Sequence, residues 1–193
     1  MKQILISILL IFGHSLLYAG SANHLKHLFT HNSAVGPDSL ILKLAEMKTD
    51  TLDCSADAYW QIIAKGKEYI PKLIAALTDT TPTSIYNLCK GGNLNIGDLC
   101  YFALEEIGDF PAYIVTRIQF DVIEVKDNWS CWSFYEYLFD NRNKLEYQEK
   151  AKTFYEKSTF KFVKFPNSKM TDCMKMYNIT GRYKFIEYKA LDR

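Results

Sequence analysis

Two apolar stripes of helical period in the middle of the chain most constrain its fold. The first consists of Ile70, Leu73, Ile74 and Leu77, and the second runs from Ile96 to Ile107. Apolar residues at positions i, i+3, i+4 and i+7 lie on one face of an α-helix. The pattern predicts two amphipathic helices that pack against each other as an antiparallel hairpin.

A second helical hairpin is predicted between Pro111 and Phe139. Apolar residues follow Pro111 as far as about Phe120, a loop covers residues 121–130, and the aromatic run Cys131–Phe139 supplies the partner helix. Pro71 and Pro111 lie 40 residues apart and each opens an apolar helix. This spacing is typical of a two-helix solenoid repeat.

The segment 67–140 resembles HEAT repeats. Pro71 to Ile74, the turn residue Asp79 and the run Ile96–Gly108 fall where that family keeps its packing residues. The chain departs from the family pattern at Gly97, where a basic residue is common, and in a first loop longer than the usual tight turn. The resemblance implies a solenoid of helical hairpins and a habit of protein binding, not a chemical activity.

We therefore expect one all-α, or α-dominated, domain over residues 23–193, with a helical core from 38 to 157. A surface helix is predicted from Asn141 to about Ser158, with Tyr147, Ala151, Phe154 and Tyr155 on its inner face. The tail, 158–193, changes character. Its aromatic residues partly alternate with lysines in two stretches, which is consistent with a small C-terminal β-hairpin.

The first 22 residues have the pattern of a signal peptide. Lys2 precedes an apolar run, Ile4–Phe12, and small residues near Ala19 and Ala22 offer cleavage sites. The apolar run is shorter than the roughly 20 residues of a membrane-spanning helix. We predict a secreted or periplasmic protein with no transmembrane segment after cleavage.

Removal of this leader leaves 22 basic and 22 acidic residues, a formal charge of zero. Proteins that bind nucleic acid usually carry a basic excess or a basic stripe. The balance of charge therefore predicts no nucleic-acid partner.

Five cysteines remain in the mature chain, and an oxidising compartment would allow some of them to pair. The segments 80–95 and 121–130 are expected at the same end of the helical hairpins, so we predict a disulfide between Cys89 and Cys131. Cys54 and Cys173 could form a second bridge, although the pattern gives no geometry for it. Cys100 lies within an apolar stripe and is expected to be a buried thiol.

Histidine positions limit the chemistry that the sequence supports. His24, His27 and His31 could share a helical face and bind a metal ion, but they lie beside the cleavage site, and we predict no metal and no cofactor. No histidine follows His31, which disfavours Cys–His, Ser–His and zinc-hydrolase schemes. We predict no catalytic residue, and Glu105 and Glu106 are read as part of a solvated helix face.

The predicted function is an exported, non-enzymatic protein-binding module of an inhibitor or immunity type. Its predicted contact residues combine a long loop with aromatic residues near the second loop: Thr81, Tyr86, Lys90, Asn93, Trp129 and Trp132. Two alternatives stay open. One is an enzyme that acts on cell-wall or glycan substrates through carboxylates such as Asp98 or Asp121. The other is a structural accessory of an envelope complex.

Overall fold

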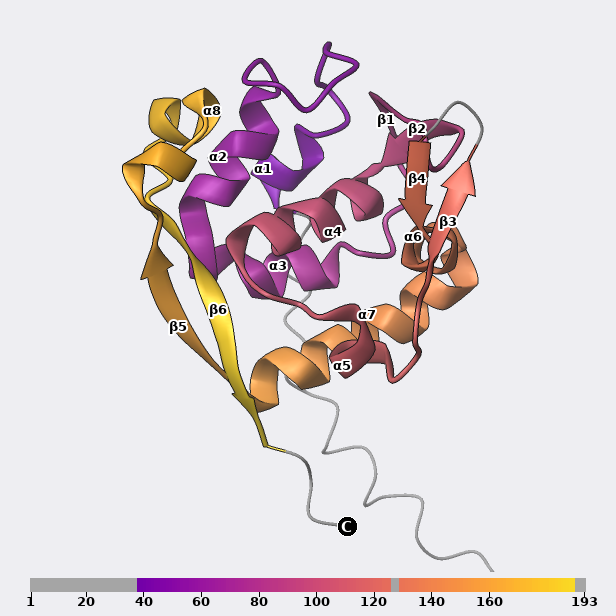
Figure 1. The fold of residues 1–193 in the computed structure, drawn as a ribbon. Coiled ribbons are helices and arrows are strands. Elements are labelled where there is room, and N and C mark those ends of the chain that lie inside the picture. The colour runs from indigo at the N-terminus through magenta and orange to yellow at the C-terminus, as the bar shows by residue number, and fades with distance from the viewer. Residues whose placement is uncertain (1–37, 126–128, 190–193) are drawn as a thin grey trace, which may run out of the picture. The chain divides into compact units, whose positions relative to one another are not determined.

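The computed structural model describes residues 38–125 and 129–189, about 50% of them helical and 20% in strands. The helices are α1 (Ser39–Leu42), α2 (Asp57–Lys65), α3 (Ile70–Ala75), α4 (Ile96–Ile107), α5 (Ala112–Thr116), α6 (Ser133–Phe139), α7 (Asn141–Lys157) and α8 (Asp172–Met176), with 3-10 turns η1 (Gly66–Tyr69) and η2 (Asn167–Lys169). The strands are β1 (Pro82–Asn87), β2 (Gly92–Asn95), β3 (Val122–Val125), β4 (Trp129–Trp132), β5 (Ser158–Lys164) and β6 (Gly181–Tyr188). They form three two-stranded antiparallel sheets, β1–β2, β3–β4 and β5–β6 (Figure 1).

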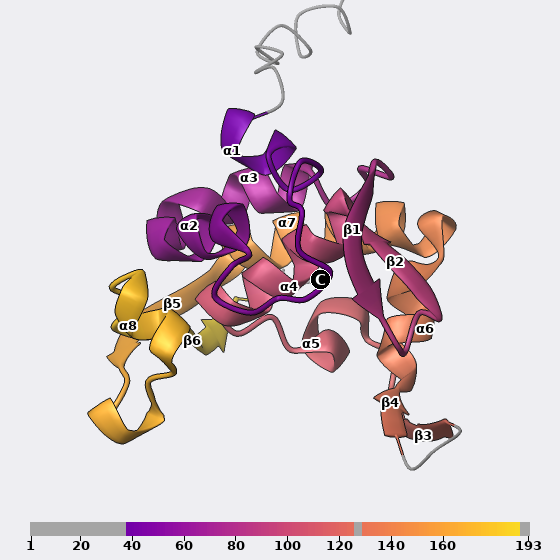
Figure 2. The ribbon, with the colours of Figure 1, turned by 90° about the horizontal axis from the view of Figure 1, so that it is seen from above.

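Helix α4 lies at the centre of this arrangement (Figures 1 and 2). Nine of its twelve residues are buried, so it must be covered on nearly every side, and α2 and α3 pack against it. A capping box starts the helix: Asn95 Oδ1 accepts a hydrogen bond from the Asp98 N–H, and the Asp98 carboxylate accepts one from the Asn95 N–H.

Gly97 allows the start of α4 to approach the chain that follows α3. The Gly97 N–H donates to the Asp79 carbonyl at 2.8 Å. A Cβ atom at this position would collide with the Leu77 carbonyl group. This close approach accounts for a glycine at this position.

Helix α7 packs against α3 and α5 and covers a further side of the core. Tyr147, Ala151 and Phe154 are buried at the helical spacing expected from the sequence, and Tyr155 is partly buried. Gln148 of α7 donates hydrogen bonds to the carbonyl groups at the end of α3.

The last elements form a C-terminal lobe, which we define as residues 158–189. It consists of the β5–β6 ribbon, η2 and α8. Phe160 and Phe185 pair directly across the ribbon, and both rings contact Phe154 of α7. The Asp109 N–H donates to the Tyr183 carbonyl at 2.9 Å, which joins β6 to the end of α4.

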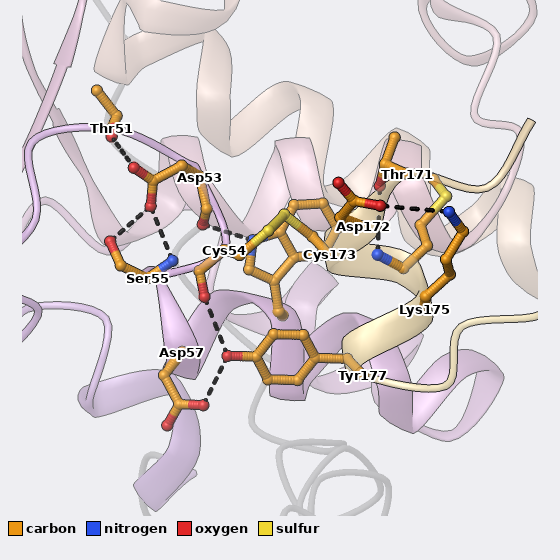
Figure 3. The surroundings of a disulfide bond; sticks show 12 residues. Thr51, Asp53, Cys54, Ser55, Asp57, Thr171, Asp172, Cys173, Lys175 and Tyr177 are labelled. Carbon is orange, nitrogen blue, oxygen red and sulfur yellow. Dashed lines mark hydrogen bonds and ion pairs between the residues drawn. A yellow bond between two sulfur atoms is a disulfide. The ribbon is translucent and has the colours of Figure 1, made fainter.

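A disulfide between Cys54 and Cys173 fastens the tip of the lobe to the loop before α2 (Figure 3). Beside it, the Tyr177 hydroxyl donates to Asp57 Oδ1 at 2.9 Å and lies 3.2 Å from the Cys54 carbonyl oxygen, a second acceptor for the same proton. The Tyr177 ring also stacks on Trp60. The loop before α2 and the segment around α8 are therefore linked covalently and by polar contacts.

The prediction of an all-α fold is wrong, because the fold mixes helices with three β-ribbons. The segment 80–95, predicted to be a loop, forms β1 and β2. Within it Thr83 and Ile85 alternate inward and Leu94 is buried, a period of two that the surrounding Thr, Pro, Gly and Asn residues disguise. None of the helices in the described part of the chain is long and apolar enough to cross a membrane.

The second predicted helical hairpin also differs from the structure. Helix α5 ends at Thr116, where Arg117 adopts a left-handed conformation with φ 64°. The predicted loop 121–130 contains β3, and the predicted helix from Cys131 begins as β4 before α6 starts at Ser133. The aromatic run is therefore divided between a strand and a short helix.

Candidate functional site

The first ribbon, β1–β2, is built from an inward and an outward face. Ile85 is buried, and the buried Thr83 hydroxyl donates to the Leu94 carbonyl at 2.9 Å. Tyr86 points the other way and is 53% exposed. Gly91, with φ 65°, makes the turn between the strands, because few other residues adopt this conformation without strain.

The loop before α2 supports the free edge of β1. The Tyr86 N–H donates to the Asp50 carbonyl at 3.1 Å, and the Ser84 hydroxyl lies within hydrogen-bond distance of the Met47 and Thr49 carbonyl oxygens, which share its one proton. The ribbon is thus held along its length and not only at its base.

The second ribbon, β3–β4, pairs Val122 with Trp132 and Ile123 with Cys131. Its base is closed by Asp121 and Ser133: the Ser133 N–H donates to the Asp121 carbonyl, and the Asp121 N–H donates to Ser133 Oγ, both at 2.8 Å. These bonds fix the point at which β4 gives way to α6.

A disulfide between Cys89 and Cys131 joins the two ribbons, and it is the pair expected from the sequence. Cys89 lies in the β1–β2 turn and Cys131 in β4, with a Cα–Cα distance of 5.7 Å. We call β1–β2 and β3–β4 together the hairpin platform (Figure 1).

A buried ionic network anchors the base of the hairpin platform. Asp98 Oδ1 lies 2.6 Å from Lys144 Nζ, and Asp98 Oδ2 lies 2.6 Å from Lys90 Nζ. Lys144 Nζ also donates to Asn95 Oδ1 at 2.8 Å. Burial lowers the pKa of the Lys144 ammonium group, and the charge of Asp98 opposes this effect. The network ties the end of β2, the start of α4 and helix α7 together.

Comparison with known proteins gives no match. No protein-family model, no curated protein and no solved structure corresponds to the chain. The function is therefore inferred from the geometry of the described residues.

Two of the predicted contact residues are engaged inside the protein. Lys90 is held by Asp98, and its ammonium group also lies 5.5 Å from the centre of the Phe139 ring. Trp132 is half-buried; its ring packs edge-on against Phe120 and at a tilt against Phe134. These two side chains stabilise the hairpin platform, whatever else they contact.

Three further predicted residues are exposed on the first ribbon. Tyr86 pairs with Asn93 across the strands, and Asn93 Nδ2 donates to the Thr83 carbonyl at 3.1 Å. Thr81 is exposed just before β1. The side chain of Trp129, in β4, and the three histidines near the N-terminus lie outside the described residues.

Two exposed apolar residues of the hairpin platform were not predicted. Leu88, next to Cys89, is 43% exposed, and Val122 in β3 is 69% exposed. The sequence signal for Leu88 was weak because a single leucine in a loop is ordinary. Leu88 becomes a candidate contact residue only because it lies beside the disulfide and two residues from the exposed Tyr86.

The carboxylates considered for acid–base chemistry lie in different surroundings. Asp98 is buried and ion-paired on both oxygens, whereas Asp121 is exposed. Burial raises the pKa of Glu105 and Glu106, with the charge of Arg182 opposing it. Glu105 and Glu106 are neighbours on one helix, so they cannot straddle a substrate as the carboxyl pair of a glycosidase does.

Within residues 38–125 and 129–189, no group of three or more His, Cys, Asp or Glu side chains could hold a metal ion. Cys100 is the free thiol of the described chain, and burial raises its pKa far above the ordinary value. A thiol in this state is a poor nucleophile.

Proposed function

We propose that the chain is an exported protein-binding module and that the hairpin platform is its contact surface. The observation that carries this proposal is the placement of Tyr86 and Leu88. Both are exposed apolar residues beside a disulfide, on a ribbon whose other face is buried.

Preorganisation is the physical argument for a binding role. A tyrosine or leucine on a mobile loop loses conformational freedom when it binds, and that loss lowers the affinity. Here the Cys89–Cys131 disulfide, the Asp50 hydrogen bond and the ionic network at Asp98 restrain the ribbon before any partner arrives. Tyrosine is also enriched at the energetic centres of protein interfaces.

Export is the second part of the proposal. The two disulfides fit an extracellular or periplasmic protein. We infer that the first 22 residues act as the cleaved leader that brings the chain to that compartment. An inhibitor or immunity-type protein, which neutralises one partner, is the form of binding that we favour.

The test is partner capture with matched variants. Mature wild-type chain is immobilised without reductant and exposed to envelope and culture-supernatant fractions of its host. The test variant is Tyr86→Ala with Leu88→Ala. The control is Tyr113→Ala with Leu145→Ala, since these two residues are each 59% exposed on α5 and α7.

We expect wild type and control to capture one stoichiometric partner, and the hairpin variant to lose it with an unchanged melting temperature. Retention by the hairpin variant would contradict the proposed surface. Recovery of the chain in a permanent multi-protein assembly, insensitive to both variants, would instead favour a structural accessory of the envelope.

A further inference from the structure

The charges of the chain are separated in space, although its net charge is close to zero. The C-terminal lobe, residues 158–189, has seven basic and two acidic residues, a formal charge of +5. The rest of the described chain, residues 38–125 and 129–157, has 12 basic and 18 acidic residues, a formal charge of −6. We call these residues the acidic body.

Lys161 and Lys184 show that the positive charge of the lobe is concentrated. They face each other directly across β5 and β6, and both are exposed. Like charges at directly opposed positions destabilise a strand pair. Lysine on a free edge strand can prevent aggregation, which would explain Lys161. It does not explain Lys184, because the far edge of β6 is already joined to Gly108 and Asp109.

The lobe exposes further lysines and two large aliphatic side chains. Lys164, Lys169, Lys175 and Lys189 of the lobe are exposed, and so are the apolar residues Met176 and Ile186. Among the described residues, two ion pairs involve basic residues of the lobe, Lys175 with Asp172 and Arg182 with Asp109. The lobe therefore presents ammonium groups interspersed with apolar side chains.

We propose that the C-terminal lobe adsorbs to the surface of an anionic phospholipid bilayer. Exposed lysines attract the negative lipid surface, and apolar side chains among them can enter the headgroup region. Exposed charges are screened over a Debye length of about 8 Å at physiological ionic strength, so the attraction depends mainly on the charges nearest the lipid. The acidic body favours an orientation with the lobe towards the lipid, because an approach through the body would bring its carboxylates close to the negative surface.

The kind of basic residue favours a lipid surface over a nucleic acid. Sites that recognise nucleic acid commonly use arginine, which forms paired hydrogen bonds with phosphate, and aromatic rings for stacking. The one arginine of the lobe, Arg182, is engaged by Asp109, so the lobe offers a nucleic acid no free guanidinium group. Lysines act as point charges that need no exact geometry, which suits a fluid layer of headgroups.

This surface is separate from the hairpin platform. Figures 1 and 2 show the lobe and the four platform strands on opposite sides of α4. A protein adsorbed through the lobe would leave the hairpin platform facing away from the lipid. The inference goes beyond the proposed function and does not depend on it.

Vesicle co-sedimentation of the full mature chain tests the proposal. One set of vesicles contains equal parts of phosphatidylglycerol and phosphatidylcholine, and the other phosphatidylcholine alone. The test variant is Lys161→Glu with Lys184→Glu, which replaces one like-charge pair by another and so keeps the cost of strand pairing similar. The control is Lys48→Glu with Lys152→Glu, two exposed lysines of the acidic body, which changes the net charge by the same amount.

We expect wild type and control to sediment with the anionic vesicles, and not with the neutral ones. One lysine near an anionic surface contributes about fivefold to affinity, so loss of two should weaken binding by roughly 30-fold or more. High salt should release the protein. Equal weakening by the control, equal binding to neutral vesicles, or binding to heparin or DNA but not to vesicles would each overturn the proposal.

Discussion

Asp98 and Lys144 form an ion pair with 2.6 Å between Oδ1 and Nζ, and both side chains are fully buried. The pair joins the first turn of α4 to α7. Taking two charges out of water is costly, so such a pair is stable only if its remaining groups are satisfied. Asn95 and Lys90 supply those further contacts.

Lys144→Met should therefore destabilise the protein strongly. Removal of one partner from a buried pair typically costs about 3–5 kcal/mol, because the other charge stays buried with fewer contacts. Urea unfolding followed by circular dichroism measures the change. Arg142→Met is the control: Arg142, near the start of the same helix, pairs with Asp140 and its side chain is 90% exposed, so its loss should cost less than about 1 kcal/mol. Similar losses in the two variants would show that the buried pair is unimportant.

Gly97→Ala should destabilise the start of α4 even though alanine favours helices. The added Cβ would collide with the Leu77 carbonyl, and strain of this kind typically costs about 1–3 kcal/mol. Gly92→Ala is the control, because a Cβ there meets no atom within 4 Å. It should change the free energy of unfolding by less than about 0.5 kcal/mol. A stabilised Gly97→Ala protein would contradict the close approach of α4 to residues 77–79.

Helices with a long apolar period could be read from the sequence, and short ribbons could not. Helix α7 has 17 residues and α4 has 12, long enough for their inner faces to repeat. In β1 the inward alternation consists of Thr83 and Ile85 alone. Two residues do not establish a period, and the nearby Pro, Gly and Asn residues favoured a loop.

Only part of the candidate site could be predicted, because some of its contacts join residues that are distant in the sequence. Tyr86 and Asn93 are exposed on the predicted segment, but Lys90 is held by Asp98. The partner that completes this network, Lys144, is distant in sequence, and a single sequence gives no sign of such a pairing. The positive charge of the C-terminal lobe can be counted from the sequence, but the net charge of the whole mature chain is zero and gives no sign of it.

The pH dependence of the free energy of unfolding should reveal the burial of the Glu105 and Glu106 carboxyl groups. Burial raises the pKa of both carboxyls above their ordinary value of 4.5. Between that value and the raised pKa the folded protein binds more protons than the unfolded chain, so stability falls as pH rises through this window. Glu105→Gln should make the protein more stable at neutral pH, with a smaller gain near pH 4.5.

Urea unfolding at several pH values above 4.5 measures this effect, with Glu149→Gln on the exposed side of α7 as control. Asp38 does not contribute to the change in stability above pH 4.5. Despite burial, the hydrogen bond from Lys72 holds the pKa of the Asp38 carboxyl group below 3.8. A Glu105→Gln variant with the same pH profile as wild type would show that Glu105 is solvated.

The Cys54–Cys173 disulfide should govern the stability of the C-terminal lobe more than that of the core. It joins residues 119 positions apart, against 42 for Cys89–Cys131, and loop-closure entropy predicts about 5 and about 4 kcal/mol of stabilisation respectively. Cys54→Ser with Cys173→Ser should also raise amide hydrogen exchange in α8, whose remaining anchors include the polar contacts of Tyr177 and the packing of Met174 against the core. Cys89→Ser with Cys131→Ser should instead raise exchange in β1 and β4.

Unfolded, non-reduced wild type should react with a thiol reagent once, at Cys100. A second reactive thiol, or equal exchange changes in the two variants, would contradict this division of roles, because Cys54–Cys173 fastens the C-terminal lobe to the loop before α2, whereas Cys89–Cys131 joins the two ribbons of the hairpin platform.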